Sequence, residues 1–381
     1  MIKKIFFIFL LLTFIACCNR VSKEKSEIDI TSEKQILVKT IKLDTLHLDK
    51  IESSYLGSLR VIDDSLFFID NRFCWVYSFD TTGRFFSRFL GQGKGPKELP
   101  TGFIDAYSFI NGCQHLFIGS SWDCHLYNED WEREKSYTIN WKIEHSNEEM
   151  LKNPEPDMPG LYSLMWDKLR VKSYNNYVYL PIESQHPTFN MVVSENYFKN
   201  ARILAKMNYK TGVVEELLGK RSPVYQEYKN LGHFSYFSYD MDKKGNFYIS
   251  FEPDSLIYKF NHQFKPLKTF GFAGREMKID YSETKLIEQF KKLFHSERKT
   301  HGYYTWIEYI DETDLLFRAY QKGEHAATDG LQIYQDGVLI ADVNVPKGMY
   351  IEGYIEPWYY SNAIIDEMNE TMEVYRFKLN L

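Results

Sequence analysis

The chain has 381 residues, of which 44% are hydrophobic and 26% charged, and its formal net charge is −6. This hydrophobic share is enough for a large core and excludes a chain that is disordered throughout. Lys and Arg are not in excess, so the composition does not favour binding to a phosphate backbone, and we expect no nucleic-acid partner. Aromatic residues make up 17% of the chain, and its 28 Tyr and 28 Phe favour β-strands over helices.

The N-terminus has the pattern of an export signal. Lys3 and Lys4 precede a run of apolar residues, 5–16, that only Thr13 interrupts. The run is too short to cross a bilayer as a helix and is typical of a secretory signal. We therefore expect residues 1–16 to be a signal peptide.

A cysteine directly follows this run. Phe14-Ile15-Ala16-Cys17 resembles the signal of bacterial lipoproteins, which has a small residue before the cysteine. The resemblance implies that the thiol of Cys17 is lipidated, that Cys17 becomes the new N-terminus, and that the lipid anchors the chain to a membrane. There are two alternatives: an ordinary signal peptide with an incidental cysteine, or lipidation of Cys18, which would put Cys17 at the small-residue position.

The residues after the signal are polar and of mixed charge. We expect residues 17–35 to form a flexible tether and residues 36–381 to form a single domain. Residue 18 is Cys rather than Asp, so retention at the inner membrane is not indicated, and Lys23 and Lys25 dilute the acidic patch of a surface-export signal. The expected location is the outer membrane, facing the periplasm, with the cell surface as the alternative.

A divergent repeat runs through the rest of the chain. Six segments show a short apolar strand, a turn, a second strand that ends in aromatic residues, another turn and a third strand. Units of this size with several strands each predict a propeller. Turns such as Asp80-Thr81-Thr82-Gly83 place Gly where φ must be positive. The first strands of the units are marked by residues 48 to 69 positions apart, namely Leu66, Leu116, Val178, Phe247, Leu315 and Ala363.

Two motifs carry a family resemblance. Asp242-Lys243-Lys244-Gly245-Asn246-Phe247-Tyr248 is similar to the D-x-x-G-N-x-Y turn of NHL-type propellers. Gly83-Arg84-Phe85, followed by the glycine-rich stretch 91–98, resembles the blade end of six-bladed propeller lipoproteins of Bacteroidota, a TolB-like group with domains of unknown function. The resemblance implies a fold but no reaction.

The predicted fold is all-β, a six-bladed β-propeller of four-stranded blades that is closed by the N-terminal strand and carries one inserted helix. The last unit has only three strands, so we expect residues 36–43 to supply the fourth and close the ring. Insertions are expected at 141–165, 183–201 and 276–302. The third predicts the helix, with Ser282 as N-cap and an apolar stripe of Leu286, Ile287, Phe290, Leu293 and Phe294.

Cys74 and Cys124 occupy equivalent positions in neighbouring units. Packed sheets are about 10 Å apart, whereas a disulfide requires Cα atoms within about 7 Å. We therefore predict that these two cysteines are not bonded to each other.

Three short motifs invite a ligand, and each has a stronger structural interpretation. The loop 91–96 lacks the Lys-Ser/Thr pair of a phosphate loop. The turn at Asp240 and Asp242 has lysines where calcium ligands would stand. His115 and His125 lie on neighbouring strands without the spacing of a metal pair. We therefore predict no metal and no cofactor. Five tryptophans are either a platform for sugar stacking or, in the interpretation we favour, blade-packing residues: Trp122, Trp131, Trp166, Trp306 and Trp358.

The expected ligand site of a propeller is the mouth of the central channel, which the innermost strands line. We expect these strands near 57–62, 103–109, 168–173, 234–240, 303–310 and 349–355. The candidate ligand-binding residues that they carry are Arg60, Asp105, Arg170, Tyr236, Trp306 and Glu352. The alternative is that these side chains are merely solvated around a watery pore.

Long loops without a catalytic motif favour a non-catalytic binding module. We expect a membrane-tethered propeller that binds a protein partner or a glycan of the cell envelope. The alternative is an enzyme at the channel mouth, either metal-assisted and lactonase-like or similar to a glycan lyase. Such an enzyme requires acidic, Asn or His side chains that converge at the mouth.

Overall fold

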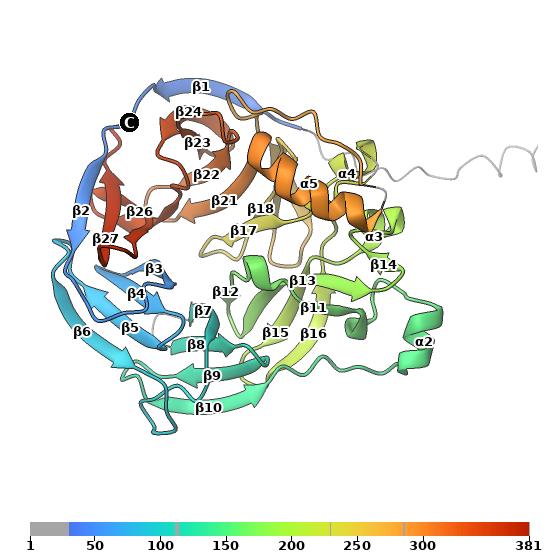
Figure 1. Cartoon of the computed structure of the whole chain (residues 1–381), viewed down its shortest axis with the longest axis horizontal. Helices are drawn as coiled ribbons and strands as arrows, with labels where there is room; N and C mark the ends of the chain where they lie inside the picture. Colours follow the sequence, from blue (N-terminus) through green and yellow to red (C-terminus); the bar gives the residue numbers. More distant parts are fainter. Residues whose placement is uncertain (1–29, 111–113, 229, 285, 381) are drawn as a thin grey trace, which may run out of the picture.

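The computed structural model describes residues 30–110, 114–228, 230–284 and 286–380. Their strands form six sheets around a central axis (Figure 1), which confirms the predicted six-bladed β-propeller. The expected signal peptide and most of the expected tether lie outside the described residues, together with Cys17, Cys18 and Cys113.

Three blades are antiparallel sheets of four consecutive strands, and in each of them the first strand is the innermost (Figure 1). Blade one contains β3 (Gly57–Ile62), β4 (Ser65–Asp70), β5 (Trp75–Phe79) and β6 (Phe85–Leu90). Blade two contains β7 (Ile104–Ile110), β8 (Gln114–Gly119), β9 (Asp123–Tyr127) and β10 (Arg133–Thr138). Blade four contains β17 (Phe237–Met241), β18 (Phe247–Phe251), β19 (Ile257–Phe260) and β20 (Pro266–Phe270).

The other three blades depart from this pattern, because blades three and five contain additional strands and blade six takes its fourth strand from an earlier part of the chain. Blade three contains β12 (Lys172–Tyr174), β13 (Tyr177–His186), β15 (Leu204–Asn208) and β16 (Val213–Leu218), and the far half of β13 also pairs with β11 (Tyr162–Leu164) and β14 (Phe189–Asn190). Blade five contains β21 (Tyr303–Ile310), β22 (Leu315–Gln321), β23 (Asp329–Gln335) and β24 (Val338–Val345). Blade six contains β25 (Ile351–Ile355), β26 (Trp358–Asp366), β27 (Thr371–Phe377) and β2 (Asp44–Leu48).

The core lies between neighbouring blades, which is why inner strands are apolar on both faces. In β4, Phe68 packs in a cluster with Tyr360 and Val374 of blade six. The next residue, Ile69, points to the other face and packs in a cluster with Phe117 of blade two. Successive side chains of a strand alternate between the faces of its sheet, and here both faces are covered. The aromatic-rich composition therefore fills the spaces between blades.

The ring is closed by β2 rather than by residues 36–43. β2 pairs antiparallel with β27, and Figure 1 shows these two strands, from opposite ends of the chain, side by side. Residues in the expected closing segment instead belong to β1 (Glu33–Val38), which adds in parallel to the outside of β24 in blade five. The reason is burial. β2 alternates buried Leu46 and Leu48 with exposed neighbours, whereas β1 is exposed over most of its length.

The predicted helix is present as α5 (Ile287–Thr300), and it lies across one face of the ring (Figure 1). Its N-terminus differs from the prediction, because Leu286 occupies the N-cap position and no side chain caps the helix. Ser282 instead donates its backbone N–H to the Glu297 carboxylate at 3.1 Å. The predicted apolar stripe is only partly covered, with Leu286 60% exposed and Ile287 53% exposed.

Polar contacts attach α5 to the ring. Arg298 donates to both carboxylate oxygens of Glu252, each at 2.7 Å. Glu297 lies 2.9 Å from Nε2 of His233, a fully buried side chain whose Nδ1 is 2.8 Å from the Thr284 hydroxyl. Paired and hydrogen-bonded charges of this kind tolerate burial.

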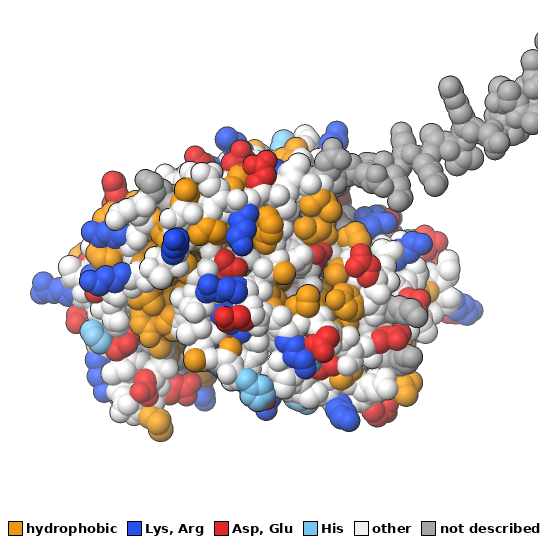
Figure 2. Space-filling view, turned by 90° about the horizontal axis from the view of Figure 1, so that it is seen from above, with side chains coloured by type: hydrophobic (Ala, Val, Ile, Leu, Met, Phe, Trp, Pro, Cys, Tyr) orange, Lys and Arg blue, Asp and Glu red, His pale blue; other side chains and the backbone are white. Residues whose placement is uncertain are grey.

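The expectation of one inserted helix is incomplete. The first insertion contains α2 (Asn147–Lys152), the second contains α3 (Glu195–Asn200), and α4 (Val224–Glu227) follows β16. Ser146 and Ser194 cap the first two through their side chains. Short 3-10 turns are η1 (Pro159–Leu161), η2 (Trp166–Lys168) and η3 (Gly232–Phe234). Viewed from the edge of the ring, acidic and basic side chains are interspersed, with hydrophobic side chains exposed between them (Figure 2).

Candidate functional site

Ion pairs join the innermost strands across the central channel. Arg60 of β3 pairs with Glu352 of β25, with 2.8 Å between Nη1 and Oε1. Arg170, two residues before β12, forms an ion pair with Glu308 of β21 and donates to the Ile307 carbonyl at 2.6 Å. Side chains from four blades therefore meet in one region, and they include three of the predicted site residues.

Trp306 belongs to the same group. The guanidinium carbon of Arg170 lies 4.1 Å from the centroid of the Trp306 ring, which is a cation–π contact. The indole Nε1 donates to the carbonyl of Ile351 at 3.0 Å, and the Tyr350 ring centroid is 4.2 Å away. The ring is thus held between blades five and six while Arg170 covers its face.

Residues that the sequence analysis did not select complete the group. The Nζ of Lys172 lies 2.5 Å from Asp240 Oδ1 and 3.3 Å from Glu308 Oε1. Asp240 also accepts the backbone N–H of Tyr309 at 2.7 Å. The sequence contained a signal for two of these residues. Lys172 follows Arg170 by two positions, and Glu308 follows Trp306 by two. Residues two positions apart in an extended chain point to the same face.

Burial and neighbouring charges separate the two central carboxyls. Burial raises the pKa of Glu308 to about 7, against the opposing effect of Arg170. Burial acts in the same direction on Asp240, but Lys172 and Arg170 outweigh it and lower the pKa of that carboxyl. The group is balanced in formal charge, since Arg60, Arg170 and Lys172 face Asp240, Glu308 and Glu352. We name these six residues the channel network, and its members are engaged with one another.

Asp105 and Tyr236, the two predicted site residues not yet described, also lie outside this network. Asp105 of β7 has a buried Oδ2 with no hydrogen-bond partner among the described residues, and burial raises the pKa of its carboxyl. Tyr236 lies under α5, where its N–H donates to Glu252 at 3.3 Å and its ring centroid is 6.3 Å from that of Phe294. A ligand role for the six predicted residues stays a prediction.

One mouth of the channel is acidic. A cavity of about 540 Å³ opens beside the channel network, and its lining includes no Lys or Arg. Lys243 lies nearby and pairs with Glu312 at 2.7 Å, while its backbone N–H donates to Asp311 at 2.9 Å. In the described residues no group of His, Cys, Asp and Glu has the arrangement of a metal site. The carboxylates that line this cavity are Asp63, Asp64, Glu308, Asp311, Glu312, Glu352 and Glu356.

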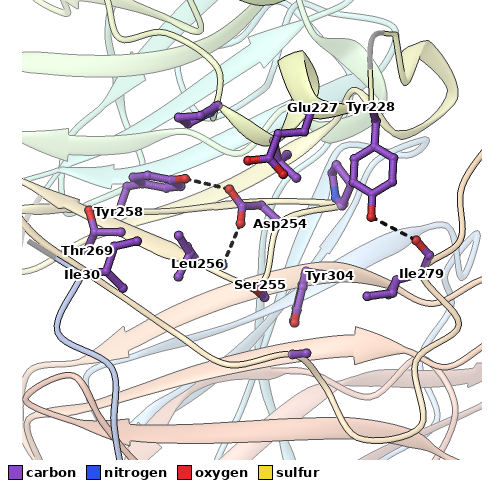
Figure 3. Close-up of a pocket in the computed structure, with 14 residues that line it drawn as sticks. Ile30, Glu227, Tyr228, Asp254, Ser255, Leu256, Tyr258, Thr269, Ile279 and Tyr304 are labelled. Atoms are coloured by element: carbon purple, nitrogen blue, oxygen red, sulfur yellow. Dashed lines mark hydrogen bonds between the residues drawn. The ribbon is translucent and has the colours of Figure 1, made fainter. Parts of the chain in front are cut away.

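A second cavity, of about 590 Å³, lies on the flank of blade four, where the described chain begins. We call it the tether-root cavity, and Figure 3 shows its lining. Its walls are largely apolar and include Ile30, Leu256 and Ile279. The remaining lining residues named in Figure 3 are polar or aromatic, and they are Glu227, Tyr228, Asp254, Ser255, Tyr258, Thr269 and Tyr304.

The two carboxylates of this cavity differ. Asp254 is buried and fully engaged, accepting from the Tyr258 hydroxyl at 2.7 Å, from the Leu256 N–H at 2.9 Å and from the Ser222 hydroxyl. Glu227 is exposed on α4, and its carboxylate has no hydrogen-bond or ion-pair partner among the described residues. Asp254 therefore shapes the wall, whereas Glu227 offers a negative charge at the rim that no described residue pairs with.

The N-terminal segment crosses the rim of the tether-root cavity. Ile30 pairs in parallel with Thr269 of β20, and the Thr31 N–H donates to the Thr269 carbonyl at 3.0 Å. The Ser32 hydroxyl then donates to the Gly271 carbonyl at 3.0 Å, after which the chain continues into β1. An extended backbone thus already lies along this cavity.

The other motifs have structural partners. The N–H of Gly95 donates to the Glu98 carboxylate at 2.8 Å, so a carboxylate of the chain meets the glycine-rich loop. Asp242 accepts from the Asn246 N–H and side-chain amide, each at 2.8 Å, and so builds its turn. Nδ1 of His115 lies 2.8 Å from the Tyr107 hydroxyl, and Nδ1 of His125 lies 2.9 Å from the Ser136 hydroxyl.

The tryptophans contact different partners. Trp131 stacks on His115 at 3.9 Å and on Phe89 at 4.6 Å, within the packing between blades one and two. Trp122 lies edge-on to Trp141 at 6.0 Å, and Trp358 contacts Arg376 at 4.5 Å. Cys74 and Cys124 are free and buried, as predicted from the register of the blades.

Comparisons with known proteins support the fold. No protein-family model and no curated protein matches the chain. A crystal structure of a DUF4221 family member from Bacteroides vulgatus is similar with a TM-score of 0.64 and 14% identity, over 89% of this chain and 98% of that one. A Bacteroides fragilis protein, named as a candidate exported protein, is similar with a TM-score of 0.52 and 12% identity, over 92% of this chain and 99% of that one.

These likenesses confirm, for the fold, the resemblance to uncharacterised propeller proteins of Bacteroidota. Within the described residues no helix combines the length and the apolar character needed to cross a membrane. The chain therefore has the same propeller fold as the Bacteroides vulgatus DUF4221 family member, which it matches over almost the whole of that protein's length.

Proposed function

We propose that this chain is a lipid-anchored protein of the cell envelope whose propeller is a binding module for a protein partner. The lipid is attached to Cys17, and the anchor lies in the outer membrane with the propeller facing the periplasm. The partner inserts a short peptide segment into the tether-root cavity.

The composition of the tether-root cavity carries the proposal. Its volume of about 590 Å³ falls within the range of about 300–1,000 Å³ that is usual for ligand pockets. Apolar walls of Ile30, Leu256 and Ile279, next to a Glu227 carboxylate that no described residue pairs with, match an apolar side chain followed by Lys or Arg. A saccharide has no large apolar side chain and matches these walls less well.

The N-terminal segment supports a peptide as the occupant. Ile30 contributes its side chain to the cavity while its backbone pairs with Thr269 of β20. A partner peptide would lie beside this segment and place its apolar side chain against Ile30, because peptides commonly bind in extended form with side chains in pockets.

The position of the cavity also suits an anchored protein. Cys17 precedes Ile30 by 13 residues, and an extended chain spans at most about 3.5 Å per residue. Lipidation of Cys17 would therefore keep the cavity within about 45 Å of the bilayer surface. Stable anchoring by acyl chains requires more than one chain, which the lipoprotein resemblance implies.

The peptide proposal is tested with the purified mature chain against a displayed peptide library. Enriched peptides should combine an apolar residue with Lys or Arg, and their affinity should fall at least about tenfold in Glu227→Lys, a loss that corresponds to about 1.4 kcal/mol. Glu129→Lys makes the same charge change at an exposed turn and should bind normally. Failure to enrich any peptide, equal binding by Glu227→Lys, or competition by a saccharide at this cavity would overturn the proposal.

Anchoring is tested separately in cells that make the full chain. Metabolic labelling with palmitate should mark the wild type and Cys18→Ser but not Cys17→Ser. A label that survives in Cys17→Ser would contradict lipidation at this position. Protease treatment of intact cells should leave the propeller uncut if it faces the periplasm, whereas digestion would indicate surface display.

A further inference from the structure

A third cavity lies between two insertions, apart from both the channel and the tether-root cavity. Its volume is about 450 Å³, and it lies between the segment that carries α2 and η1 and the hairpin of β13 and β14. We call it the insertion pocket. Its lining includes no Lys, Arg, Asp or Glu, and it shares no residue with the tether-root cavity. The polar and aromatic residues of its lining include Trp122, Asn147, Ser163, Gln185 and His186.

Two buried polar atoms of the lining have no partner among the described residues. They are Nε2 of His186 and Oγ of Ser163. The His186 residue is only 8% exposed, so water reaches it poorly. Buried polar atoms in native proteins are nearly always hydrogen-bonded, and an unsatisfied one requires an explanation. These two atoms belong to residues that line the same pocket, where a bound molecule can supply their partners.

The proton position on His186 can be inferred. The Thr188 backbone N–H, which can only donate, lies 3.2 Å from Nδ1, so Nδ1 accepts and carries no proton. A neutral imidazole with an accepting Nδ1 carries its proton on Nε2. Nε2 is therefore a donor that needs an acceptor. The Ser163 hydroxyl can donate and accept, so the pair matches a hydroxyl-bearing ligand.

The rest of the pocket completes the chemistry of an uncharged, hydroxylated ring. Trp122 is half-buried and offers an aromatic surface, while the exposed amides of Asn147 and Gln185 can each donate and accept. The Trp122 side chain has an apolar ring with one polar N–H, so it suits a ligand that is apolar on one face and hydrated on the other. The absence of charged lining residues argues against phosphate, sulfate or acidic sugars.

We propose that the insertion pocket binds a neutral saccharide of one or two pyranose units. A sugar hydroxyl accepts from His186 Nε2, a second exchanges hydrogen bonds with Ser163 Oγ, and the apolar face of the ring lies on Trp122. The inference is independent of the peptide proposed for the tether-root cavity, because the two cavities share no lining residue.

The test uses the purified mature chain and saturation-transfer NMR with four probes. Chitobiose, cellobiose and mannobiose are neutral, and digalacturonate is an acidic control. At least one neutral disaccharide should receive transfer and give a measurable Kd, and digalacturonate should not. Binding of no neutral disaccharide, or equal binding of digalacturonate, would overturn the proposal.

Variants locate the site. Ser163→Ala and His186→Phe should each weaken the bound disaccharide about tenfold, the usual order for losing one buried hydrogen bond. His186→Gln, which keeps a donor, should recover part of this loss. His125→Gln is the matched control, because His125 is similarly buried at 4% exposure but does not line the pocket, and its affinity should be unchanged. If His186→Phe fails to fold, Ser163→Ala decides, since it removes a single oxygen. Unchanged affinity in a folded Ser163→Ala would contradict the assignment.

Discussion

Leu46 of β2 lies directly opposite Val374 of β27, and this contact joins the first described part of the chain to the last blade. Both side chains are buried in the cluster between blades six and one. His47, the next residue, points to the other face and is 76% exposed in its side chain. The ring is therefore closed by a strand that has one buried face. Without this strand, the edge of β27 would be left unpaired.

Leu46→Ala should destabilise the closed ring by about 2–5 kcal/mol, the usual cost of truncating a buried leucine. Two effects lower the free energy of unfolding. The truncated side chain buries less apolar surface, and a cavity is left between blades six and one. Urea denaturation followed by circular dichroism measures the free energy of unfolding. His47→Ala alters the exposed face of the same strand and should change stability little. Equal effects of the two substitutions would contradict the closing role of β2.

Arg170→Ala should cost about 3–5 kcal/mol of stability, as expected when one partner of a buried ion pair is removed. Glu308 and Asp240 would then be buried with Lys172 as their remaining close cation. The thermal midpoint measures the effect. Lys50→Ala breaks the exposed pair with Glu370 and should leave the midpoint almost unchanged. A variant of Arg170 as stable as the wild type would show that the channel network is not required for the fold.

Stability should fall on acidification partly through His115. Burial lowers its pKa to about 4, whereas an unfolded chain has the ordinary value of 6.5. Between these pH values the unfolded state binds more protons than the folded state, so the free energy of unfolding rises with pH. The stability that His115 contributes is present above pH 6.5 and is lost as the pH falls from 6.5 to 4. The full contribution is about 3 kcal/mol, from about 1.4 kcal/mol for each pH unit.

His115→Gln should flatten that part of the pH profile while keeping a partner for the Tyr107 hydroxyl. Urea denaturation at intervals between pH 4.5 and 7.5 would measure the slope. His325→Gln is the control, because its side chain is 86% exposed. An unchanged slope in His115→Gln would show that its burial does not govern acid sensitivity.

Cys74 and Cys124 should resist iodoacetamide in the native protein at pH 8. Burial raises the pKa of the Cys74 thiol to about 11 and that of Cys124 to about 12, so little reactive thiolate is present. Both should react fully in urea, and peptide mass spectrometry would report each site. Rapid native labelling of Cys74 would contradict the packing between blades one and two, and rapid labelling of Cys124 would contradict the packing between blades two and three. A disulfide between the two cysteines would contradict the register of the blades.

Much of the propeller fold could be predicted from local patterns in the sequence. Short apolar runs placed strands such as β4 and β18, and turns such as that of Gly245, where φ is +80°, marked the hairpins. The helix caps were not predicted: the expected cap Ser282 was wrong, and α2 was missed although Ser146 followed by Glu149 has the spacing of a capping box. The closing strand was misplaced because residues 33–38 and 44–48 both have a strand pattern, and only pairing with distant edges separates their roles.

The candidate sites depend on distant contacts to a greater degree. Trp306 was placed correctly on an innermost strand, whereas Arg170 lies two residues before β12, and the contacts of Arg170 with Trp306 and Glu308 require ring closure. Nothing near Ser163 in the sequence indicates His186, yet both line one pocket. Strand and turn patterns act over a few residues and are encoded locally. The partners of a buried charge or of an unsatisfied hydroxyl are decided by which blades become neighbours, which depends on packing over the whole chain.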